Sequence, residues 1–133
     1  MSATHLLDTG WIVRHLRGAR AYTQTTIGIS PPQLAVSVVS TVELYEGVFR
    51  SRTPAADGQE LLLFLGDKTI LPITADIGRL VGEHRARLRS QNQLVGDLDP
   101  LIAVTALAHD LPLLTPNRRH FARISGLRIV SNP

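Results

Sequence analysis

Five oxygen-bearing side chains stand beside short apolar runs in four separate segments of the chain. They are Asp8, Glu43, Asp97, Asp99 and Asn117. If the apolar runs are strands of one parallel sheet, these side chains gather at the sheet edge where ligands bind. Hard oxygen donors gathered at such an edge are what Mg²⁺ or Mn²⁺ requires. The sequence therefore predicts a metal site that could activate water.

Each of these side chains also has a purely structural explanation. Asp8 could serve a turn. Glu43 could complete a capping box with Ser40 or Thr41. The remaining three could cap helix starts. The joint order and spacing of these side chains favour the metal site. Carboxylates held about 5 Å apart repel by roughly 3 kcal/mol per pair at an effective dielectric near 20, and this cost is tolerable only if a divalent cation offsets it.

The acids near residue 100 need separate assignments because they are two residues apart. We assign Asp97 to the N-cap of the helix that follows, which leaves Asp99 free to point into the crevice. His120 has two open interpretations, a surface histidine or a contact to phosphate or leaving group, and the surface histidine is favoured.

Apolar periodicity predicts strands alternating with helices, which indicates a parallel sheet covered on both faces. The expected strands cover residues 5–7, 34–39, 69–73, 113–115 and 127–130. One helix should begin at Ser40 or Thr41, with Glu43 in its first turn. The other expected helices cover 11–16, part of 21–33, 54–65, 74–91, 97–109 and 118–121.

Composition favours one globular domain over residues 1–133, because 44% of the residues are hydrophobic and 19% are charged. The absence of cysteine excludes disulfides and thiolate metal sites. No secretory leader or membrane-length apolar run is found, so a cytoplasmic protein is expected.

The net charge is only +3, but 13 of the 14 basic residues are arginine, whose planar fork suits phosphate. One cluster holds Arg85, Arg87 and Arg89. A second holds Arg118, Arg119, Arg123 and Arg128. Either cluster could follow a nucleic-acid backbone or be a solvated surface. Candidate RNA contacts are Arg85, Arg118 and Arg119.

Four motifs together resemble the PIN-domain toxins of the VapC family over nearly the whole chain. Residues 6–9 (LLDT) look like the opening signature, and 42–48 (VELYEGV) are similar to the E-L-x-x-G-V helix. Residues 99–103 (DPLIA) resemble the D-x-x-I-A run, and 115–121 (TPNRRHF) match T-x-N-x-x-x-F. The resemblance implies a three-layer α/β/α PIN-like domain with a central parallel sheet of about five strands.

The resemblance also implies site residues. Asp8, Glu43 and Asp99 would bind Mg²⁺ or Mn²⁺, and Asn117 would occupy a fourth catalytic position. Supporting roles fall to Thr9, Thr115 and Asp97. Three positions depart from the family pattern: Gly10, Pro116 and His120.

The implied activity is that of a metal-dependent endoribonuclease, the toxin of a toxin–antitoxin pair, which hydrolyses RNA, with tRNA as a candidate. The implied partners are a VapB-type antitoxin and a second copy of the chain. The alternative is a catalytically weak or silent PIN-like module that binds RNA or protein. A receiver or dehalogenase fold is disfavoured, because no D-x-D motif follows the first strand and Lys68 is the only lysine.

Overall fold

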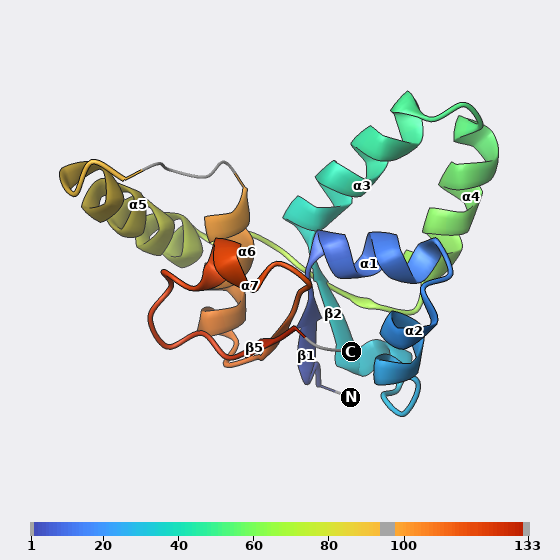
Figure 1. The fold of residues 1–133 in the computed structure, drawn as a ribbon, viewed down its shortest axis with the longest axis horizontal. Helices are drawn as coiled ribbons and strands as arrows, with labels where there is room; N and C mark the ends of the chain where they lie inside the picture. The colour runs from blue at the N-terminus through green and yellow to red at the C-terminus, as the bar shows by residue number, and fades with distance from the viewer. Residues whose placement is uncertain (1, 94–97, 132–133) are drawn as a thin grey trace.

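The computed structural model describes residues 2–93 and 98–131. Strands and helices alternate along these residues (Figure 1). The elements are β1 (His5–Leu7), α1 (Thr9–Leu16), α2 (Arg20–Thr26), the 3₁₀ helix η1 (Pro31–Gln33), β2 (Leu34–Ser37), α3 (Val38–Arg50), α4 (Pro54–Leu65), β3 (Thr69–Leu71), α5 (Ala75–Ser90), α6 (Asp99–Ala108), β4 (Leu113–Leu114), α7 (Arg118–Phe121) and β5 (Ile129–Val130).

The five strands form one parallel sheet in the order β3-β2-β1-β4-β5. The chain first builds outward from β1 to β3 and then crosses back to add β4 on the other side of β1. Strand order therefore reverses between β1 and β4. Crevices at such reversals, beyond the carboxyl ends of the strands, are where open α/β sheets bind ligands.

Consecutive strand residues face opposite sides of the sheet and enter two different cores. In β1, Leu6 packs in one core and Leu7 in the other. In β4, Leu113 and Leu114 divide in the same way. The first core includes α6 residues and Phe121 of α7, and the second includes α1, α3 and α4 residues. The predicted three-layer α/β/α architecture is confirmed.

The boundary between β2 and α3 differs from the prediction. The strand ends at Ser37, and the helix begins at once with Val38, so neither Ser40 nor Thr41 caps it. The Ser37 hydroxyl accepts a hydrogen bond from the Val39 backbone N–H at 3.1 Å. The predicted capping box is therefore wrong, and Glu43 lies in the second turn of α3 rather than the first.

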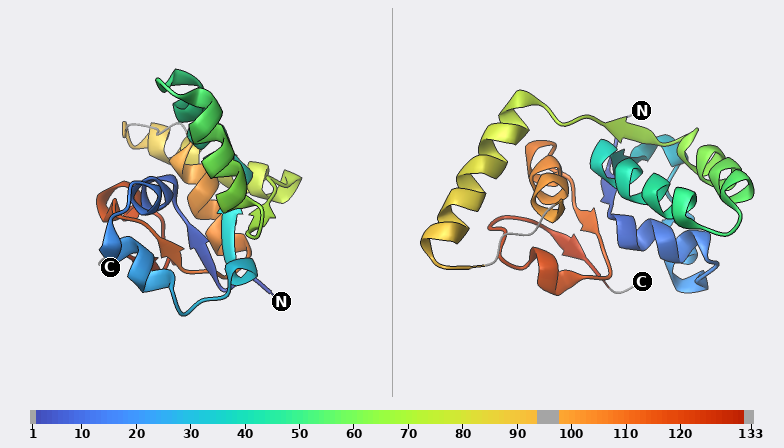
Figure 2. Two further views of the ribbon diagram at one scale, coloured as in Figure 1. Left: turned by 90° about the vertical axis from the view of Figure 1, so that its right-hand side faces the viewer. Right: turned by 90° about the horizontal axis from the view of Figure 1, so that it is seen from above.

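The other predicted elements are confirmed, with ends that differ by at most two residues. Helix α6 begins at Asp99, and Leu98 precedes it without a side-chain cap. Asp97, assigned to that cap, lies outside the described residues. Figure 2 shows α3 and α4 packed side by side beyond one end of the sheet, with α5 extending on the opposite side.

None of the helices in the described residues is long and apolar enough to cross a membrane.

Candidate functional site

Asp8 lies at the strand-order reversal, between the end of β1 and the start of α1. Its side chain is only 4% exposed. Its Oδ2 atom accepts a hydrogen bond of 2.7 Å from the Thr115 hydroxyl, which follows β4. The same hydroxyl accepts a hydrogen bond from the Asn117 backbone N–H at 3.0 Å. Thr115 thereby fixes the ends of β1 and β4 relative to each other.

Several groups act on the pKa of the Asp8 carboxyl, and the net effect is a raised pKa. Burial is the largest cause, because it penalises the charged form. The hydrogen bond from Thr115 opposes it, and the negative charges of Asp99 and Glu43 raise the pKa further. The Asp8 carboxylate thus lies close enough to Asp99 and to Glu43 to be repelled by both.

Thr9 connects the start of α1 to Glu43 on α3. Its Oγ1 atom lies 2.7 Å from Glu43 Oε1 and 2.9 Å from Ser40 Oγ. A carboxylate can only accept, so Thr9 donates its single proton to Glu43 and is left to accept from Ser40. Ser40 is fully buried. The two hydroxyls orient the Glu43 carboxylate.

Asp99 reaches the site from the first residue of α6. Its Oδ2 atom lies 3.2 Å from His120 Nδ1, and the two side chains are 37% and 61% exposed. His120 is thus an exposed histidine, as favoured from the sequence, but it also contacts Asp99. Asp99 and Glu43 line one surface pocket together with Glu46 and Leu98.

Asn117 precedes α7 but makes no side-chain cap hydrogen bond. The structural explanation for this residue therefore fails. A Cβ atom added to Gly10 would lie 3.4 Å from Asn117 Nδ2 and 3.2 Å from the Pro116 ring. The Asn117 amide therefore lies beside Gly10 at the start of α1.

Oxygen atoms dominate the donor set at this edge, which fits a hard divalent cation. Among the described residues, however, no three His, Asp or Glu side chains are close enough together to hold a metal ion. A hydrogen bond from Thr9 holds Glu43, and His120 lies within ion-pair distance of Asp99. A divalent cation held by these carboxylates would compete with the two contacts for their oxygen atoms.

Ser40 and Glu46 are site residues that the sequence analysis missed. Ser40 precedes Glu43 by three residues and Glu46 follows it by three, so all three share one side of α3. That spacing was the available signal, but Ser40 had been assigned to a helix cap.

A PIN-domain family model matches residues 5–127 of this chain. The chain belongs to the PIN-domain family. Curated relatives include ribonuclease VapC19 of Mycobacterium tuberculosis, 34% identical with 92% of this chain and 96% of the relative covered. Ribonuclease VapC10 of the same species is 36% identical over 92% of this chain and 90% of its own. These identities assign the chain to the VapC ribonucleases within the PIN-domain family.

Solved structures of VapBC complexes have the same PIN-domain fold. The VapBC2 complex of Rickettsia felis, bound to a DNA fragment from its promoter, gives a TM-score of 0.84 at 26% identity and covers 96% of this chain and 97% of that one. The DNA-bound VapBC of Salmonella typhimurium gives 0.87 at 24% identity, with the same coverage. The likeness to the second structure, at this identity, concerns the fold alone.

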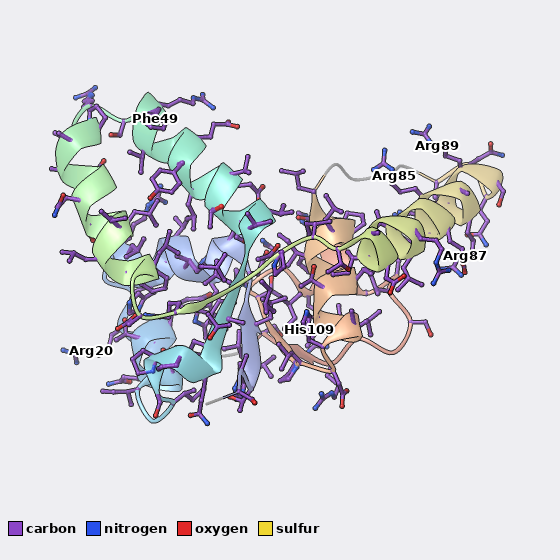
Figure 3. The ribbon with its side chains drawn as sticks, turned by 180° about the vertical axis from the view of Figure 1, so that it is seen from behind. Arg20, Phe49, Arg85, Arg87, Arg89 and His109 are labelled. Atoms are coloured by element: carbon purple, nitrogen blue, oxygen red, sulfur yellow. The ribbon has the colours of Figure 1, made fainter. Side chains whose placement is uncertain are left out.

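The first arginine cluster of this PIN domain does not form one surface. Figure 3 shows Arg85 and Arg89 on one side of α5 and Arg87 on the other, as residues four and two apart on a helix must lie. Arg87 also donates a hydrogen bond of 3.2 Å to the Nδ1 atom of His84.

The second arginine cluster also divides. Arg118 donates to the Ile129 carbonyl and the Ser131 hydroxyl, both at 3.1 Å, and Arg128 donates to Asp110. Arg119 and Arg123 instead line a pocket next to Asp99.

Proposed function

We propose that this protein is a metal-dependent endoribonuclease that acts as the toxin of a toxin–antitoxin pair. The observation that carries the proposal is that Asp8, at the strand-order reversal of a PIN domain, lies within electrostatic reach of both Glu43 and Asp99. The raised pKa of Asp8 supports it, because a site that gathers repelling carboxylates suits a cation. Residues 1–133 would act as one PIN domain.

Asp8, Glu43 and Asp99 are the proposed ligands of Mg²⁺ or Mn²⁺, which would supply an acidified water and stabilise charge on the departing oxygen. The chain's own contribution is to orient these ligands. Thr115 holds Asp8, while Thr9, supported by Ser40, holds Glu43. The Asn117 amide, beside Gly10, is suited to hydrogen-bond a phosphate oxygen.

RNA is the proposed substrate, and tRNA is the candidate class within it. A relative from Shigella flexneri is named a tRNA(fMet)-specific endonuclease and is 28% identical over 92% of this chain. Activity in the cytoplasm is consistent with such a substrate.

A VapB-type antitoxin is the proposed partner, because structural neighbours are VapBC complexes. The α3–α4 pair supports a protein partner, since large apolar side chains there face solvent. They include Val42 (58% exposed), Phe49 (76%), Leu62 (57%) and Leu63 (72%). A second copy of the chain is a further proposed partner. Co-purification with the product of an adjacent small reading frame tests the antitoxin, and a frame whose product does not bind contradicts it.

The decisive experiment for the enzyme compares RNA cleavage by the purified full chain in Mg²⁺, Mn²⁺ and EDTA. Cleavage should require the metal, and Asp99→Asn should abolish it. Asp97→Asn is the matched control and should retain most activity, since it removes the same charge from a nearby residue that is not a proposed metal ligand. Full activity in EDTA overturns the metal mechanism. Activity kept in Asp99→Asn but lost in Asp97→Asn reverses the two assignments.

The alternative function is a catalytically weak or silent PIN-like module that binds RNA or protein. It is favoured by the finding that, among the described residues, no three His, Asp or Glu side chains are close enough together to hold a metal ion. This alternative predicts RNA or protein binding with no cleavage in either metal, even at high protein concentration.

A further inference from the structure

A second pocket, of about 450 Å³, adjoins the acidic site on the side of α5 and α7. Asp99 lines both this pocket and the acidic one. The volume of this second pocket falls within the range of about 300–1,000 Å³ that is usual for sites of small ligands. A group bound here would therefore lie directly beside a reaction at Asp99.

Apolar side chains from three helices and the segment after α7 form much of the pocket wall. They are Leu88, Pro100, Phe121 and Ile124. A planar ring that is largely apolar on its faces fits such a wall, as unstacked RNA bases do when proteins hold them.

His84 adds a polar group with a defined direction of hydrogen bonding. The residue is only 7% exposed and lines the pocket. Its Nδ1 atom accepts a hydrogen bond from Arg87, because a guanidinium can only donate. The ring hydrogen is therefore on Nε2. Burial, and then the charge of Arg87, lower the pKa of His84, so the ring is neutral near pH 7. A neutral donor suits the acceptor atoms of a base.

The lining of the pocket also carries positive charge. Arg119 and Arg123 line it, and both residues are exposed to solvent. Guanidinium groups at the rim suit the phosphate attached to a bound nucleoside. Asp99, an apolar wall and two arginines thus line one pocket, which suits a base with its attached phosphate beside the acidic site.

We propose that this pocket binds one nucleoside of the RNA strand next to the bond that is cleaved. The base lies against the apolar wall and accepts a hydrogen bond from His84, and its outer phosphate meets Arg119 and Arg123. The pocket thereby selects the base beside the cleavage position. This inference rests on the proposed ribonuclease function.

The test uses the full chain in EDTA buffer, where no cleavage occurs. Binding of the four ribonucleoside 5′-monophosphates is compared with binding of ribose 5-phosphate by NMR titration. At least one nucleotide should bind about tenfold or more tightly than ribose 5-phosphate, a difference of about 1.4 kcal/mol. His84→Leu should remove this preference, and His84→Gln, which keeps a donor, should retain part of it.

Arginine variants test the rim. Arg119→Ala should weaken all four nucleotides and ribose 5-phosphate alike, whereas Arg20→Ala is the matched control. Arg20 lies on α2, far from α5 (Figure 3), and its variant should bind as the wild type does.

Three results overturn the inference: no nucleotide binding, equal binding of ribose 5-phosphate, or a preference that survives His84→Leu in a folded variant. Because binding is measured without metal, it separates the two proposals. Selective binding with no RNA cleavage in Mg²⁺ or Mn²⁺ refutes the nuclease but not the pocket. Cleavage without selective binding refutes the pocket alone.

Discussion

Asp8 combines deep burial with a proposed role as a charged metal ligand, two conditions that oppose each other. Its raised pKa means that ionising the side chain costs more in the folded chain than in the unfolded chain. In the absence of metal, the carboxylate therefore destabilises the fold near neutral pH. Residues held for function often carry such a cost in stability.

We predict that Asp8→Asn raises the melting temperature in EDTA at pH 7 and abolishes metal-dependent cleavage. The amide oxygen can still accept the hydrogen bond from Thr115. The folded pKa of Asp8 lies above its unfolded value of 3.8, so the cost appears as pH rises through the folded pKa. The advantage of the variant should therefore vanish near pH 3. Thermal melts at both pH values measure this.

Asp76→Asn is the control for that variant, because it removes the same charge from an exposed helix start. It should leave the melting temperature unchanged or slightly lower, since acids favour helix N-termini. An Asp8→Asn variant that melts lower than the wild type in EDTA at pH 7 contradicts the electrostatic explanation.

Gly10 and Pro116, two departures from the family pattern, are neighbours in space. A Cβ atom on residue 10 would lie 3.2 Å from the Pro116 ring, which is tighter than ordinary van der Waals contact. The two departures therefore accommodate each other, which their separation in sequence could not reveal.

A double-mutant cycle should detect this coupling. Alanine at a helical glycine gains about 1 kcal/mol of helix propensity. Gly10→Ala should therefore raise the free energy of unfolding less in the wild type than in the Pro116→Ala variant. Urea unfolding should give a coupling free energy of about 0.5–1 kcal/mol between the two positions. Gly82→Ala, where a Cβ would meet no atom within 4 Å, gives the unopposed gain. Additive effects at residues 10 and 116 would exclude the contact.

Ser37 determines where α3 begins, and it therefore determines the position of Glu43. The sequence misled here because Val36, Val38 and Val39 are β-branched and typical of a strand. The Ser37 cap and packing on the sheet outweigh that preference. The elements themselves were predictable from apolar periodicity, whereas this boundary depends on one hydrogen bond.

We predict that Ser37→Ala lowers the free energy of unfolding by about 1 kcal/mol, because the Val39 N–H loses its acceptor. Cleavage should also fall, since Glu43 depends on the position of the helix. Thr41→Ala is the control, because the Thr41 hydroxyl donates to the Val38 carbonyl within the helix and caps nothing. A larger loss of stability for Thr41→Ala in denaturant titrations would restore the original cap assignment.

At the scale of the whole molecule, segments far apart in the sequence meet at the carboxyl ends of the strands, where Asp8 after β1 contacts Thr115 after β4. The family motifs of the chain predicted Asp8, Glu43 and Asp99 as a set, because the residues keep their order and spacing. The pocket lined by His84 and Arg119 was not predictable, since its walls come from helices whose mutual packing no local pattern specifies.

Three histidines in different regions should make global stability fall in mild acid. Burial, and second a nearby cation in each case, lower the pKa of His5, His15 and His84 below 6.5. The unfolded chain therefore takes up protons first, and stability is lost as pH falls from 6.5 toward each folded pKa. Urea unfolding from pH 7.5 to 5 measures the decline.

His15→Gln should reduce that pH dependence, because the variant lacks the group whose pKa is lowered. His15 contacts Thr23 of α2 and the Phe64 ring of α4, so its loss also lowers stability at pH 7.5. The slope with pH, and not the absolute value, is therefore the informative quantity. An unchanged slope for His15→Gln would refute its contribution.

The hydrogen bond between Asp8 and Thr115 spans 107 positions of the chain. A ribosome adds about 5–20 residues per second, so Asp8 is made on the order of ten seconds before its partner. A message broken before the codon for Leu113 yields a polypeptide that lacks β4 and cannot assemble the edge beside β1. Only a translation product that extends past β4 to Thr115 can therefore form this hydrogen bond.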